Sequence, residues 1–110
     1  MLSNTRFRSH VDLKDGGSVT LGFADATITL GTAQLELLGV TVRLTADGKP
    51  ALTIPRRPWT GRDEIVRYAH VVRFDEPTYR SLVVEVFALP AVSAAVHEAL
   101  ALRAAAQVAV

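Results

Sequence analysis

The feature that most constrains the fold is a change of phase in two neighbouring runs of alternating apolar and polar residues. In residues 18–30 the apolar side chains occupy odd positions up to Phe23 and even positions after it, and residues 34–45 change phase around Gly39. One face of a strand stays buried through such a change only if an extra residue is inserted, so we predict a β-bulge near residues 24–25. Two adjacent runs that change phase together indicate one long hairpin that bends.

The flanking segments extend this hairpin into an antiparallel sheet. Residues 6–13 form a predicted strand, which the turn sequence KDGGS joins to the next one, and the sequence ADGK at residues 46–49 predicts a second tight turn. Residues 50–55 form a short strand that its two prolines confine to an edge or a strand end. Residues 65–74 alternate again and form the last predicted strand.

The apolar period changes from two to 3.6 after this strand. Apolar residues recur at helical spacing from Tyr79 to Phe87, Asp75 suits the N-cap, and Pro90 stops or kinks the helix. The alanine-rich residues 91–110 favour a second helix. The sequence therefore predicts an α+β fold, an antiparallel β-meander of about five strands followed by C-terminal helices packed on the sheet. We divide it into a sheet-plus-helix domain, residues 1–90, and an alanine-rich C-terminal helix.

Composition excludes several classes of protein. A chain of 110 residues is long enough for one modest core, and 49% apolar against 21% charged residues is typical of a globular domain. It contains no cysteine, which excludes disulfides and thiolate metal sites. We find no signal peptide and no run of about 18 apolar residues, so we expect a cytoplasmic protein without a membrane partner. The net charge of +1 means that any basic surface is local.

The segment IPRRPWTGRDE, residues 54–64, is the candidate for function. With the basic residues of the strand that follows, it supplies the candidate nucleic-acid-binding residues Arg56, Arg57, Trp59, Arg62, Arg67 and Arg73. Guanidinium groups bind phosphate oxygens bidentately, and an indole ring can stack on an exposed base. The alternative is that the arginines are solvated charges, some paired with Asp63 or Glu64, and that Trp59 covers an edge of the core.

Other site chemistry is sparse. The three histidines, His10, His70 and His97, are too far apart in sequence for a local metal motif, and we interpret His70 as lining the core. Asp63 and Glu64 balance charge on an arginine-rich segment. No phosphate-binding loop, nucleophile elbow or metalloprotease motif occurs. We therefore expect no enzyme activity, no cofactor, no metal and no small-molecule substrate.

The chain also resembles a known family. The succession ATITLGTAQLELLGVTVRLTADGKPALTIPRR, a glycine-containing loop, VVRF and an amphipathic helix is similar to SpoVG, a family of small bacterial septation and sporulation regulators. The resemblance runs from about Arg6 to about Leu89. It implies a sheet-plus-helix domain that dimerises and binds DNA or RNA without catalysis.

The resemblance also implies where basic residues should lie. One group follows the strand that ends in proline, here Arg56, Arg57 and Arg62, and the other lies near the start of the helix, where this chain has only Arg80. Two functions stay open. One is a homodimeric nucleic-acid-binding regulator, in which Trp59 or Tyr68 adds stacking. The other is a protein-interaction or oligomerisation module in which the alanine-rich helix or a strand edge recruits a partner.

Overall fold

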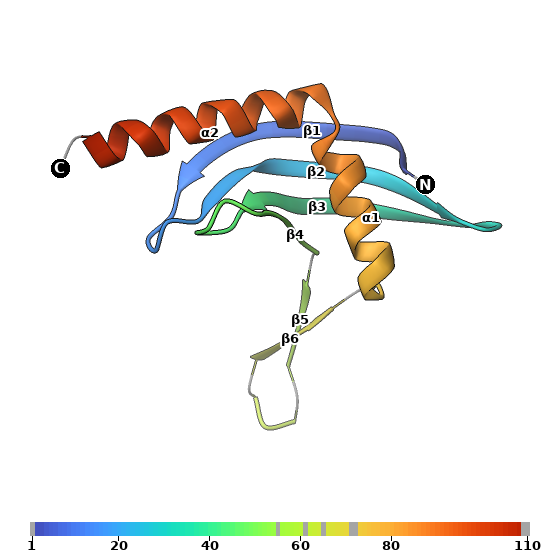
Figure 1. The fold of residues 1–110 in the computed structure, drawn as a ribbon. Helices are drawn as coiled ribbons and strands as arrows, with labels where there is room; N and C mark the ends of the chain where they lie inside the picture. Colours follow the sequence, from blue (N-terminus) through green and yellow to red (C-terminus); the bar gives the residue numbers. More distant parts are fainter. Residues whose placement is uncertain (1, 55, 61, 65, 71–72, 109–110) are drawn as a thin grey trace.

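The computed structural model describes residues 2–54, 56–60, 62–64, 66–70 and 73–108, with the backbone alone described for residues 30, 33, 56–60, 66–70 and 108. Four strands form one antiparallel sheet in the order β1-β2-β3-β4, two more form a separate hairpin, and two helices follow (Figure 1). The bounds are β1 Leu2–Leu13, β2 Val19–Leu30, β3 Ala33–Leu44, β4 Pro50–Thr53, β5 Arg56–Thr60, β6 Val66–His70, α1 Glu76–Phe87 and α2 Pro90–Val108.

The α+β class is confirmed, and the strand count needs a correction. The main sheet has four strands, not about five, because the strand expected at residues 65–74 pairs instead with β5, in a segment that we interpreted as a loop. The segment RRPWT shows no apolar alternation, and Pro58 cannot donate a ladder hydrogen bond. In a two-stranded hairpin every strand is an edge strand, where proline is tolerated.

The predicted bend of the long hairpin is present, with one bulge in each strand. In β3, Leu38 and Gly39 together face Asp25, and the N–H group of Gly39 donates to Asp25 Oδ1 at 2.7 Å. Gly39 has a φ of 71°, which a residue with a side chain rarely adopts. In β2 the extra residue is Leu21, three to four positions earlier than we predicted. Phe23 consequently leaves the core face, on which our prediction had placed it.

Gly22 sits beside the bulge of β2 because the neighbouring strand passes very close to it. A Cβ atom at this position would lie 2.1 Å from the carbonyl oxygen of Arg8 in β1, well inside van der Waals contact. Any larger residue would force the two strands apart. The glycine therefore permits the curvature that lets the sheet wrap over the helices.

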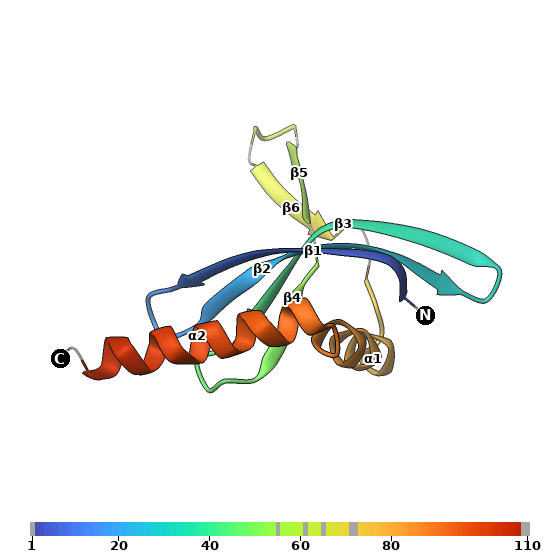
Figure 2. The same ribbon diagram turned by 90° about the horizontal axis from the view of Figure 1, so that it is seen from above.

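Both helices cover the same face of the sheet, and their axes are bent by 82° at Pro90 (Figure 2). Asp75 caps α1 as predicted: its Oδ1 accepts a hydrogen bond from the N–H group of Thr78 at 2.9 Å. Hydrogen bonds from Thr78 lower the pKa of the Asp75 carboxyl. Across the described residues, no single helix is long and apolar enough to span a membrane, and only α1 and α2 taken as one bent pair reach that length and composition.

The core lies between the curved sheet and the two helices. Helix α2 runs along β1 and β2 (Figure 1) and buries Val92, Ala95 and Ala99 against the sheet. Near its C-terminal end, Arg103 Nη2 donates to the carbonyl oxygens of Gly17, at 2.8 Å, and of Ala46. The alanine-rich helix α2 therefore forms part of the core. Arg103 bonds its C-terminal end to the β1–β2 turn and to the β3–β4 turn.

A side chain of α1 occupies the free edge of β4. The Tyr79 hydroxyl accepts a hydrogen bond from the Leu52 N–H group at 2.9 Å and donates one to the Leu52 carbonyl oxygen, also at 2.9 Å. Leu52 is paired with Val42 of β3, and because both of its backbone groups bond to Tyr79, they point away from β3. Tyr79 therefore satisfies the groups through which an edge strand would recruit another strand.

Candidate nucleic-acid interface

The hairpin of β5 and β6, here called the arm, leaves the sheet after β4 and rises from the face opposite the helices (Figure 2). Its register pairs Arg56 with His70, Arg57 with Ala69 and Trp59 with Arg67. Alternate positions of a strand share a face, so positions 57, 59 and 67 fall on one face of this ladder. The side chains of Arg56, Arg57, Trp59, Arg67 and Tyr68 lie outside the described part of the chain.

Two more candidate arginines lie at the ends of the arm. Arg62 is exposed in the turn between β5 and β6, and Arg73 is exposed between β6 and α1. Six of the seven candidate residues, all except Arg80, therefore lie on this hairpin or at its ends, clear of the helices (Figure 1).

Charge is distributed unevenly between the arm and the rest of the chain. Residues 56–73 contain five arginines and two carboxylates, a local net charge of 5 − 2 = +3. The remaining residues contain 7 basic and 9 acidic side chains, a net charge of 7 − 9 = −2. The small total of +1 thus conceals a basic arm on a slightly acidic body.

Arg80 occupies a different position. It belongs to α1, which covers the opposite face of the sheet from the arm (Figure 2), and its guanidinium pairs with Glu76 Oε1 one helical turn earlier. Its side chain remains 74% exposed. The helix therefore presents a partly neutralised cation on a side of the molecule that the arm does not reach.

The face of the sheet opposite the helices, here called the outer face, was not identified from sequence. The register places Arg8, Phe23, Thr41 and Thr53 in one row across β1, β2, β3 and β4. The ring of His10 stacks on that of Phe23, with centroids 6.2 Å apart and planes inclined by 27°. Alternation of residues 6–13 puts Arg8 and His10 on one face, but Phe23 joins them only because of the bulge at Leu21.

Arginines flank this aromatic pair. Arg8 Nη2 lies 4.0 Å from Asp25 Oδ2, and 70% of the Arg8 side chain is exposed. Arg43 Nε donates to Thr53 Oγ1 at 3.0 Å, which turns its guanidinium toward the end of β4 from which the arm departs. Arg6 is exposed and faces Asp25 in the register. The outer face therefore combines one half-buried ring and one exposed ring with guanidinium groups.

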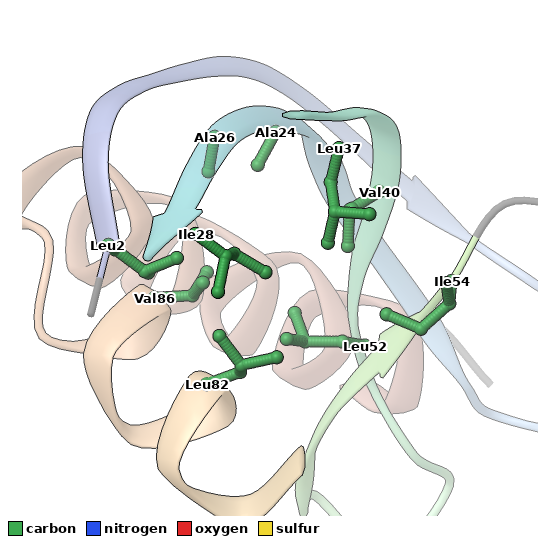
Figure 3. A pocket seen from close by; sticks show the side chains of 10 residues that line it. All are labelled: Leu2, Ala24, Ala26, Ile28, Leu37, Val40, Leu52, Ile54, Leu82 and Val86. Atoms are coloured by element: carbon green, nitrogen blue, oxygen red, sulfur yellow. The ribbon is translucent and has the colours of Figure 1, made fainter. Parts of the chain in front are cut away.

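The small cavity between α1 and the sheet is apolar. A pocket of about 20 Å³, close to the space of one water molecule, lies between α1 and the sheet (Figure 3). Its lining is wholly apolar: Leu2, Ala24, Ala26, Ile28, Leu37, Val40, Leu52, Ile54, Leu82 and Val86. Such a pocket offers no group to orient a polar substrate.

The lowered pKa values of two further aspartates have local causes. Hydrogen bonds from Lys14 and Thr45 lower the pKa of Asp12 and of Asp47, respectively; Asp12 lies near the end of β1 and Asp47 in the turn before β4. Within the ranges that the structure describes, no three histidine, cysteine, aspartate or glutamate side chains gather to hold a metal ion.

The chain was compared with family models, curated proteins and solved structures. None of these three comparisons found a match.

Proposed function

We propose that this chain is a non-catalytic, nucleic-acid-binding regulatory protein of the SpoVG type, which acts as a dimer and contacts phosphates through the arm. The observation that carries this proposal is the local net charge of +3 on a projecting hairpin, while the rest of the chain is at −2. A basic projection on an acidic body directs a polyanion to one place on the surface. The resemblance in sequence supports the same assignment.

The chemistry of the arm suits a phosphate backbone. Guanidinium groups hold phosphate oxygens in bidentate hydrogen bonds, and each phosphate that is neutralised releases counterions. If about four arginines of the arm engage duplex DNA, the log–log salt slope should be about −3.6. Affinity should then fall about a hundredfold between roughly 50 and 200 mM salt.

The test is the replacement of Arg56 and Arg57 together by alanine, with binding to duplex DNA measured across a salt series. The magnitude of the slope should fall by about 1.8, since two counterion-releasing contacts are lost. The matched control is Lys14→Ala with Lys49→Ala, which removes the same charge from two turns of the body, where each lysine pairs with a nearby aspartate. An equal fall in the control, or none in the arm variant, would contradict the proposal.

A second function is favoured by a different observation. On α2, Leu100 is 48% exposed and Leu102 is 42% exposed, among alanines that offer little hydration. A protein-interaction or oligomerisation module would use this surface and would need no nucleic acid. The salt series separates the two functions, because the module predicts no salt-dependent binding to DNA or RNA by the parent protein.

A further inference from the structure

We propose that the outer face of the sheet is a stacking platform for single-stranded nucleic acid, with bases on Phe23 and His10 and phosphates on Arg8 and Arg43. The proposal deepens the function proposed above and rests on it. It adds a set of residues outside the arm and names the form of nucleic acid that they bind.

The first support is the pair of rings on a sheet face that no helix covers. Both helices lie against the other face, so neither helix covers the outer face along β1 and β2 (Figure 2). Phe23 is half-buried and His10 is exposed, with their rings 6.2 Å apart. Phe7 in β1 packs against the core cluster, whereas Phe23 lies on the opposite face of the sheet. Aromatic rings on an open four-stranded sheet are a common surface on which unpaired bases stack.

The second support is the placement of cations around the rings. Arg8 faces Phe23 directly across the β1–β2 pair, and 70% of its side chain is exposed. Arg43 lies two positions from Thr41, the register partner of Phe23 on β3, and is oriented by its bond to Thr53. A base on Phe23 would therefore have a guanidinium group on either side for the phosphates that precede and follow it.

The third support is continuity with the arm. The row Arg8, Phe23, Thr41 and Thr53 crosses all four strands, and three inter-strand steps span about 14 Å. Its last member, Thr53, lies three residues before Arg56, the first residue of the arm. The arm rises from this same face (Figure 2), so a strand that crosses the row arrives at the basic hairpin.

The positions of the arginines indicate the direction in which a polyanion would cross the outer face. Asp25 and Glu36 lie toward the tip of the β2–β3 hairpin, beyond Phe23. Arg6 faces Asp25 there, whereas Arg8, Thr41 and Thr53 lie in the row of Phe23 and Arg43 lies two positions from that row, on the side away from the tip. Arg8 and Arg43 attract phosphates, so the strand should run along this row from β1 across Phe23 to β4.

The test measures binding of the full chain to oligo-dT, to oligo-U and to a duplex of equal length. Phe23→Leu keeps an apolar side chain of similar volume and removes the ring, so single-strand affinity should fall roughly 5- to 150-fold. The salt slope should not change, because no charge is removed. Phe23→Trp should restore affinity, and the duplex should bind Phe23→Leu as it binds the parent. Oligo-dT and oligo-U then separate DNA from RNA as the natural ligand.

Two further variants keep the test decisive if Phe23→Leu is unstable. His10→Ala removes an exposed ring and should weaken single-strand binding without a change in the thermal midpoint, and Arg8→Gln should reduce the magnitude of the salt slope by about 0.7. Unchanged single-strand affinity in both variants overturns the platform and leaves the arm proposal standing. A parent that binds no nucleic acid overturns both proposals.

Discussion

Single residues determine where the sheet bends and where the helices begin. Leu21 and the Leu38–Gly39 pair shift the two central strands, and the carboxylate of Asp25 holds the second bulge by its bond to Gly39. The change of apolar phase predicted a bulge in both strands. It did not locate the bulge of β2, because Phe23 continues the odd apolar phase although it lies on the outer face.

At the same scale, Asp75 makes a testable contribution through its cap on α1. The folded pKa is lowered from 3.8 by hydrogen bonds from Thr78, so the contribution to stability is complete above pH 3.8 and is lost as pH falls through the folded value. Asp75→Ala should lower the thermal midpoint by a few degrees at pH 7, and the difference from the parent should shrink in acid. Asp75→Asn keeps a capping oxygen that does not titrate. Thermal melts across pH check this, and a difference independent of pH would contradict it.

Among the elements, α2 shows how an alanine-rich helix can pack on a sheet through one defined face. Its buried positions, Val92, Ala95 and Ala99, follow the i, i+3, i+7 spacing of one narrow face, and small side chains there let the helix lie close to β1 and β2. The sequence predicted the helix, and its alanine-rich composition predicted that its surface would pack against a partner. Which alanines meet the sheet was not predictable, since alanines also fill the exposed positions.

This packing predicts different responses from two neighbouring alanines. Ala99→Leu inserts a branched side chain into a fully buried site and should lower the free energy of unfolding by about 1–3 kcal/mol. Ala101→Leu, at an exposed position two residues away, should change it by less than about 0.5 kcal/mol. Urea denaturation of the two variants checks this. Equal effects would mean that α2 does not pack through Ala99.

The arm is the element that sequence reasoning predicted least well. Its arginines were identified as the candidate site, but the strand β5 was interpreted as a loop because Pro58 and the absence of alternation conceal it. Its partner β6 alternates and was predicted as a strand, whereas β5 is joined to it only by backbone pairing, which the side-chain pattern of RRPWT does not indicate. For the same reason the row across the outer face could not be predicted, since its members are joined only by register.

At the scale of the whole molecule, the protein is less compact than its length suggests. Its radius of gyration is 15.8 Å, against about 13 Å for a compact domain of this size. The arm and the tip of the β2–β3 hairpin extend beyond the core (Figure 1). The protein thus has a large surface area relative to the size of its core. This is a reason to expect association with a second copy.

We expect light scattering to give a mass of twice 11.9 kDa at tens of micromolar. Leu100→Glu, which places a charge on the exposed surface of α2, should shift the protein toward the monomer. Gln107→Glu adds the same charge at an exposed polar position of the helix and should leave the mass unchanged. A monomeric parent, or a dimer insensitive to Leu100→Glu, would remove α2 from the interface.

The bond between Tyr79 and the edge of β4 has a consequence for the newly made chain. Leu52 leaves the ribosome 27 residues before Tyr79, which takes roughly 1–5 s at ordinary rates of synthesis. Until α1 has folded and docked, the N–H and carbonyl groups of Leu52 are available to any other strand. Two nascent copies are therefore most prone to pair incorrectly after the sheet has formed and before its β4 edge is covered. Docking of α1 ends this interval.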